Sequence, residues 1–97
     1  MITYIAMLNF TDKGLQNVKD TTKRAAAAKE VAKKFGVNMR EIYWTMGEYD
    51  LVCVLEADSE HALSAFSLAT ATQGHIRSRS MRAYTAGEME TVLAKVP

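Results

Sequence analysis

Five polar side chains in this 97-residue sequence are candidates for a small-molecule site: Lys19, Tyr49, Asp50, His75 and Arg77. Lys19 and Arg77 are cations that can contact an anion, while Asp50 and His75 can hold or transfer a proton. All five lie at the ends of segments with strand character, so we expect a fold that gathers them at one pole of its sheet. The predicted ligand-binding site is this pole, beside the segment Gly47-Glu48-Tyr49-Asp50.

A second interpretation of these residues is purely structural. Lys19 and Asp50 have opposite charges and can form an ion pair that holds two loops together. The other polar groups would then be solvated, as charged residues at loop ends usually are. Both interpretations stay open at this point.

Metal and nucleophile chemistry have little support in the sequence. His61 and His75 are the two histidines, and neither lies at metal-ligand spacing from the single Cys53. Cys53 lies inside an apolar run, which is typical of a small buried hydrophobe. The glycines and serines form no phosphate loop or nucleophile elbow. We therefore expect no metal ion and no cofactor, and we leave open whether the protein is an enzyme.

The composition argues against two large classes of partner. Twelve basic and eleven acidic residues give a net charge of +1, so no strong field attracts nucleic acid or a membrane surface. Residues 51–55 lack the aromatic side chains on which RNA-binding domains stack bases. No apolar run reaches the roughly 18 residues of a transmembrane helix. The start of the chain lacks a signal-peptide pattern, and a lone cysteine fits a reducing compartment, so we expect a cytoplasmic protein.

The hydrophobic pattern predicts four strands and two long helices in one domain, residues 1–97. Strand character marks residues 2–10, 39–46, 49–56 and 75–84. A helical pattern begins after Thr11 and is then interrupted. It begins again at Asp20 or Thr21 and ends at Gly36. A second helix runs from an Asp58 cap to about Gln73, and Thr85 with Glu88 has the capping-box spacing of a short last helix.

This order of elements is that of an α+β, ferredoxin-like split β-α-β fold with a C-terminal helix. We expect a four-stranded antiparallel sheet with two helices on one face. The first and third strands should be central, because residues 4–8 and 51–55 are the most continuously apolar segments. A two-residue turn at Gly47-Glu48 would pair Ile42 with Cys53 and Trp44 with Leu51.

The second face of this sheet is expected to be partly apolar and uncovered. It presents Ile5, Met7, Tyr43, Val52 and Val54. An exposed apolar patch of this kind marks an interface or a ligand surface. We therefore predict a homodimer or higher homo-oligomer that packs sheet against sheet. The alternative is that the C-terminal helix folds back over this face.

An ordered set of residues along the chain resembles the GYD domain family. The matching residues are Tyr4-Ile5, Phe10-Thr11, Gly14, Asn17, Lys19-Asp20, Arg24, Tyr43, Thr45, Gly47-Glu48-Tyr49-Asp50, Gly74, Arg77, Arg82-Ala83 and Glu88. His75 departs from this pattern, where such proteins often carry a smaller polar residue, and Thr22 replaces a frequent proline.

The resemblance implies a dimeric α/β-barrel association and assigns almost no chemistry. The family is largely of unassigned function, and its wider fold relatives include small cofactor-independent or haem-degrading monooxygenases and effector-binding domains. We therefore predict a small oligomeric ligand-binding or sensor-type module. One alternative is a small cofactor-independent or haem-linked monooxygenase-like enzyme, which needs a buried ionisable group with a perturbed pKa beside a cavity. The other is a purely structural assembly unit, which needs no cavity.

Overall fold

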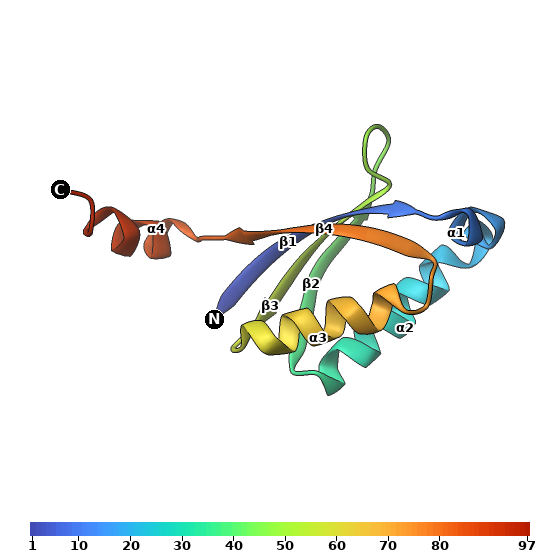
Figure 1. Cartoon of the computed structure of the whole chain (residues 1–97), viewed down its shortest axis with the longest axis horizontal. Coiled ribbons are helices and arrows are strands. Elements are labelled where there is room, and N and C mark those ends of the chain that lie inside the picture. Colours follow the sequence, from blue (N-terminus) through green and yellow to red (C-terminus); the bar gives the residue numbers. More distant parts are fainter.

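The computed structural model describes residues 1–97 and contains one four-stranded antiparallel sheet (Figure 1). The strands are β1 (Ile2–Phe10), β2 (Val37–Trp44), β3 (Leu51–Ala57) and β4 (Ile76–Ala83). Their order across the sheet is β2-β3-β1-β4. The predicted α+β, ferredoxin-like fold is confirmed, with the most apolar strands, β1 and β3, at its centre.

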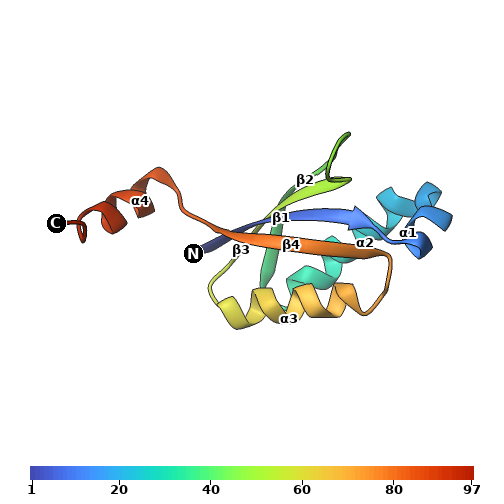
Figure 2. The same cartoon turned by 45° about the horizontal axis from the view of Figure 1, so that its top comes forward.

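Two helices, α2 (Thr21–Lys34) and α3 (Glu60–Ala71), lie on one face of the sheet (Figures 1 and 2). The short helix α1 (Asp12–Gln16) and a 3-10 turn, η1 (Val18–Asp20), precede α2. This arrangement confirms the predicted helical turn, break and second start. The segment from α1 to η1 thereby carries the chain from the end of β1 to the start of α2.

Local capping explains most helix boundaries. Gly36 ends α2 with φ +76°, a left-handed conformation in which glycine is not strained. The predicted Asp58 cap of α3 is wrong: Ser59 is the cap, and its Oγ accepts a hydrogen bond from the amide of Ala62 at 3.3 Å. An N-cap oxygen bonds the amide three residues later, so Asp58 lies outside the helix.

The hydrophobic core lies between the sheet and these two helices. Ala6 and Leu8 of β1 and Cys53 of β3 are buried there, with Leu63 and Phe66 of α3 against them. Burial of Cys53 confirms its predicted role as a small hydrophobe. The core is therefore formed by only one face of the sheet.

The β2–β3 hairpin has the predicted register but a wider loop. Ile42 pairs with Cys53 and Trp44 with Leu51, whereas the strands end at Trp44 and Leu51 and leave residues 45–50 outside them. The predicted two-residue turn is therefore wrong. The amide of Asp50 bonds the carbonyl of Leu8 in β1 at 2.9 Å, so the loop is tied to β1 as well as to the hairpin.

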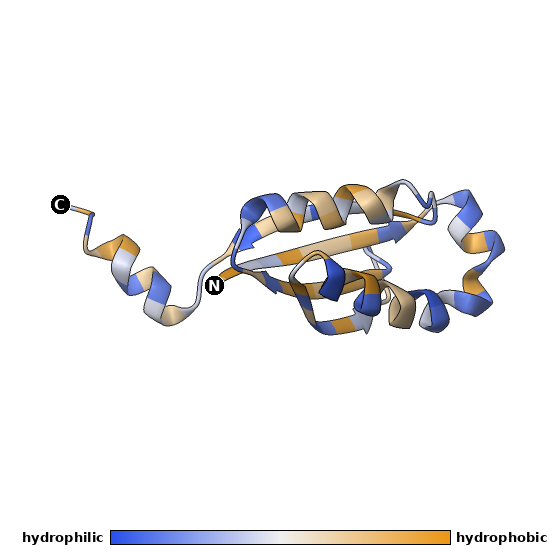
Figure 3. Ribbon diagram, turned by 90° about the horizontal axis from the view of Figure 1, so that it is seen from below, coloured by the Kyte–Doolittle hydropathy of each residue, from blue (hydrophilic) through white to orange (hydrophobic).

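The second face of the sheet is not covered by any helix (Figure 2). Ile5, Met7, Val52 and Val54 are only half-buried there. Tyr43 of β2 is 56% exposed on the same face. The helix α4 (Ala86–Leu93) extends away from the end of β4 and does not fold back over this face (Figures 1 and 3). The alternative covering by the C-terminal helix is therefore wrong for the single chain.

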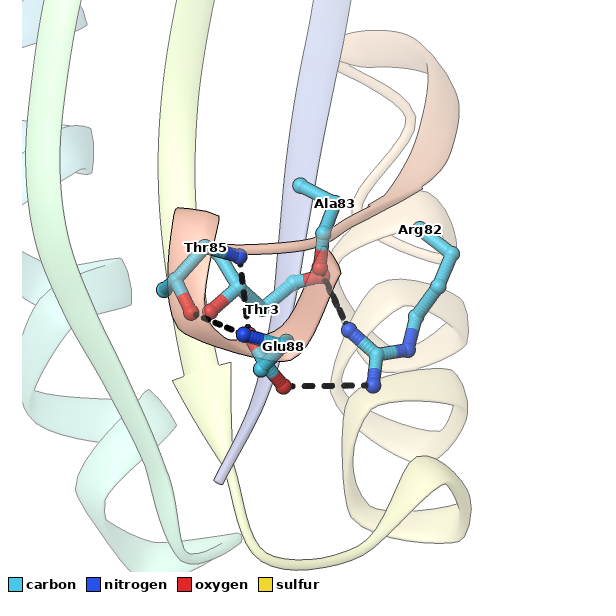
Figure 4. A network of polar contacts seen from close by, with 5 residues as sticks. All are labelled: Thr3, Arg82, Ala83, Thr85 and Glu88. Carbon is cyan, nitrogen blue, oxygen red and sulfur yellow. Dashed lines mark hydrogen bonds and ion pairs between the residues drawn. The ribbon is translucent and has the colours of Figure 1, made fainter. Parts of the chain in front are cut away.

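Polar contacts define the base of α4 (Figure 4). The Thr85 hydroxyl accepts a bond from the amide of Glu88 at 3.1 Å, and the Glu88 carboxylate accepts one from the amide of Thr85 at 2.9 Å. This confirms the predicted capping box. Arg82 lies 3.8 Å from the Glu88 carboxylate and donates to the carbonyl of Ala83. The helix start is thus anchored to β4, although its apolar side chains remain exposed.

Candidate functional site

A polar hollow of about 640 Å³ lies where β1 ends and β4 begins. Tyr49 and Arg77, both predicted site residues, line it. Lys13 and Arg79 add two cations to its wall, and Asp12 and Glu48 add two carboxylates. The excess of cations favours a ligand with negative charge. We call this space the polar hollow.

Asp50 lies beside the polar hollow but its carboxylate is used inside the protein. Its Oδ2 accepts a hydrogen bond from the backbone amide of Phe10 at 2.9 Å and a longer one from Asn9 Nδ2 at 3.5 Å. Asn9 Nδ2 also donates to the carbonyl of Glu48 at 2.9 Å. The carboxylate thus joins the hairpin loop to the end of β1.

The structure does not bring Lys19 to the other predicted site residues. Lys19 is exposed on η1 and lines no cavity. The alternative ion pair between Lys19 and Asp50 is wrong, because the ion pairs present are Lys33–Glu30, Arg40–Glu56 and Arg82–Glu88. Asp50 takes its bonds from backbone and amide groups instead.

A second cavity, of about 450 Å³, lies between the sheet and the helices α2 and α3. Its floor is formed by buried residues of the core, including Leu8, Cys53 and Leu55. Ala25 and Ala28 of α2 line it, and their small side chains leave this space free. His75 lines this cavity and not the polar hollow. We call it the apolar cavity.

Polar groups of the apolar cavity lie near the N-terminus of α2 and the C-terminus of α3: Thr21, Arg24, Gln73 and His75. The Nη1 atom of Arg24 donates to the carbonyl of Asn17 at 2.7 Å. Its Nη2 atom is buried and has no hydrogen-bond partner. Sequence reasoning assigned no role to Arg24, although Arg24 belongs to the ordered set of residues that resembles the GYD family.

Two ionisable groups of the apolar cavity have perturbed pKa values. Loss of contact with water lowers the pKa of His75, and the positive charges of Arg24 and Lys13 lower it further. Its imidazole is therefore neutral at neutral pH and able to accept a proton. Burial raises the pKa of the Cys53 thiol to about 11, so the thiol stays protonated and is a poor nucleophile. No group of three or more possible metal-ligating side chains occurs in the structure.

The backbone of His75 joins the two sites. Its carbonyl accepts a hydrogen bond from the amide of Thr11 at 3.1 Å, and the Thr11 hydroxyl donates to the carbonyl of Gly74 at 2.5 Å. A Cβ atom at Gly14 would lie 2.1 Å from the His75 carbonyl oxygen. Only glycine allows α1 to lie this close to the start of β4.

The family model of the GYD domain matches residues 4–93. The chain belongs to the GYD domain family. The glutamine synthetase and cystathionine beta-lyase binding protein of Thermus thermophilus is 27% identical to this chain over 90 residues. The match covers 92% of this chain and 95% of that protein.

Solved structures with the same fold support the architecture of this GYD domain. The crystal structure of FFRP-DM1 has a TM-score of 0.61 and 22% identity, and the match covers 87% of this chain and 100% of that one. A hypothetical protein from Pyrococcus horikoshii has a TM-score of 0.53 and 23% identity, with 88% and 92% covered. At these identities the likeness shows the fold.

None of the helices in the structure combines the length and the apolar character that crossing a membrane requires.

Proposed function

We propose that this GYD domain is a small homo-oligomeric binding module that holds a small polar molecule in the polar hollow. The observation that carries the proposal is the convergence of Tyr49 and Arg77 with Lys13 and Arg79 around one open space. The Thermus relative, named for binding two enzymes, supports a binding role for the family. A purely structural assembly unit would need no such space.

The module is expected to pair through the open sheet face. Met7 lies opposite Val52 on one side and Arg79 on the other, and Ile5 and Val54 continue the apolar surface along the same strands. A lone chain leaves this surface in water, which favours burial against a second copy. Glu41 and Arg79 lie at opposite edges of the face, so a two-fold interface can place unlike charges together.

Sedimentation velocity at micromolar concentration tests the pairing. The wild-type protein is expected to sediment as a dimer or larger oligomer, and Met7→Glu as a folded single chain, because a charge at the centre of the interface is costly to bury. Leu68→Glu is the matched control, since Leu68 is 68% exposed on α3, on the helix side of the sheet. A wild-type protein that sediments as a single chain would contradict the pairing.

Native mass spectrometry of freshly purified protein tests the ligand site. It reports the number of subunits and any retained small molecule in one measurement. Arg77→Gln and Tyr49→Phe should lose the retained mass while the oligomer persists. Lys23→Gln removes an exposed cation from α2, and this variant should still carry the retained small molecule. Loss of the molecule in all three variants, or retention in all three, would count against the polar hollow.

A second candidate partner is an enzyme subunit. The name of the Thermus relative favours it, and α4 provides a surface: Met89, Val92 and Leu93 are 42%, 37% and 49% exposed on a helix that projects from the domain (Figure 3). Purified glutamine synthetase and cystathionine beta-lyase serve as probes in co-sedimentation. Leu93→Asp should abolish the interaction and leave the oligomer unchanged, whereas no co-sedimentation of the wild-type protein excludes these two partners.

A further inference from the structure

The apolar cavity contains one charged side chain and no carboxylate. Arg24 carries the charge, and the remaining lining residues are apolar or neutral polar groups at neutral pH. Arg24 takes part in none of the three ion pairs of the structure. A cation without a partner at the wall of an apolar space attracts anions strongly, because a low dielectric weakens screening.

The guanidinium of Arg24 is held in place and still has a free donor. Its Nη1 bond to the carbonyl of Asn17, 2.7 Å long, fixes the group. Its Nη2 atom is shielded from solvent and bonds nothing. Buried donors without acceptors are rare in proteins and call for an explanation. Arg24 lines the cavity, so a carboxylate that reaches the guanidinium from the cavity would neutralise its charge.

The dimensions and lining of the cavity define the rest of the ligand. Its volume of about 450 Å³ lies within the roughly 300–1,000 Å³ of small-molecule sites. Leu8, Leu55 and Phe66 give it apolar walls, and Ala28 leaves room above them. Water gains few hydrogen bonds in such a space, so a hydrocarbon group is the favoured occupant.

We propose that the apolar cavity binds a small carboxylic acid with a hydrocarbon body, whose carboxylate pairs with Arg24. The hydrocarbon part fills the space between the sheet and the helices α2 and α3. His75 and Thr21, which line the same cavity, can each donate one further hydrogen bond to the carboxylate. This site lies on the helix-covered face, opposite the open sheet face, and does not depend on the polar hollow or on oligomerisation.

Calorimetric titration of the full chain with three matched probes tests the proposal. Octanoate, 1-octanol and octylamine share a hydrocarbon chain and differ in the charge of the head group. Octanoate is expected to bind with one site per chain and at least ~10-fold tighter than octanol, because a charge-assisted pair adds to burial. Octylamine should not bind measurably.

Two pairs of variants locate the site. Arg24→Met removes the charge and keeps the apolar stem. It should lower the affinity for octanoate roughly 10-fold and leave the affinity for octanol unchanged. Lys29→Met, on the exposed face of the same helix, should change neither. Ala28→Leu fills the cavity and should weaken both probes, whereas Ala26→Leu, which lies outside the lining, should not. Thermal unfolding of each variant confirms that it is folded.

An independent readout is the titration of His75 followed by NMR. A bound carboxylate beside Arg24 opposes the positive field on the imidazole, so octanoate should raise the pKa of His75 and octanol should not. This measurement needs no variant and remains informative if Arg24→Met fails to fold. Equal affinity for octanoate and octanol, or no saturable binding because a segment of another copy occupies the space, would overturn the proposal.

Discussion

The Asp50 carboxylate accepts a hydrogen bond from the backbone amide of Phe10 at 2.9 Å, across 40 residues of sequence. The amide of Asp50 donates to the carbonyl of Leu8 at 2.9 Å. Asp50 therefore extends the β1–β3 pairing by one residue beyond Leu51, the first residue of β3. This relationship gives the aspartate of the Gly-x-Tyr-Asp segment a structural role at the edge of the polar hollow.

Asp50→Ala is expected to destabilise the protein by about 1–3 kcal/mol, because it leaves a partly buried amide without an acceptor. Asp50→Asn should cost less, since its amide oxygen can still accept the bond. Urea unfolding measures both. An Asp50→Ala protein of unchanged stability that has lost a retained ligand would instead place Asp50 among the ligand contacts.

Gly14→Ala is expected to destabilise the protein by about 1–3 kcal/mol, the usual cost of overpacking. The added methyl group would lie 2.1 Å from the carbonyl oxygen of His75, so α1 or the start of β4 must move. Gly87→Ala is the control: the nearest atom to a Cβ there is Thr85 Oγ1 at 3.9 Å. This second substitution lies in α4 and should be neutral or favourable, because alanine has the higher helix propensity. Thermal unfolding distinguishes the two.

Stability should fall as the pH is lowered through the titration of His75. Its pKa in the folded protein is lowered, chiefly by loss of contact with water and then by Arg24 and Lys13. The unfolded chain then binds a proton more readily, so the free energy of unfolding decreases from the ordinary histidine pKa down to the folded one. Arg24→Met should move the transition to higher pH. A His75→Gln protein with the full wild-type pH dependence in this window would contradict the assignment.

Cys53 should resist alkylation while the protein is folded. Burial raises the pKa of its thiol to about 11, so the thiolate that reacts with iodoacetamide is scarce near neutral pH. Labelling followed by mass spectrometry should show modification only in urea. The raised pKa also means that the free energy of unfolding decreases above the ordinary cysteine pKa, because the thiol ionises at lower pH in the unfolded chain than in the folded protein. Rapid labelling of the native protein at neutral pH would contradict the raised pKa of the thiol.

The capping box of α4 should control the order of this projecting helix. The carboxylate of Glu88 is bonded by the amide of Thr85, and this bond is the main cause of the lowered Glu88 pKa. Thr85→Ala should cost roughly 1 kcal/mol of helix stability. Amide hydrogen exchange should therefore quicken in α4 and stay unchanged in β1 and β3. The same helix should lose protection as the pH falls through the pKa of Glu88, since protonation weakens the bond.

Sequence patterns determined the elements, their order and the two faces of the sheet. Alternating side chains placed Ile5 and Met7 on one face and Ala6 and Leu8 on the other, because successive residues of a strand point in opposite directions. The glycine at 36 and the Thr85–Glu88 spacing marked helix boundaries for similarly local reasons. These features depend on neighbouring residues and are readable without a fold.

The tertiary structure alone decided which polar side chains meet. Tyr49 and Arg77 line the polar hollow together with Lys13, whereas His75 turns to the apolar cavity with Arg24. The direction in which a loop side chain points depends on hydrogen bonds to backbone groups far away in the sequence, such as the one between the Asp50 carboxylate and the Phe10 amide. A cavity likewise depends on how far two helices stand from a sheet, which is a sum of many packing contacts and has no local signature in the sequence.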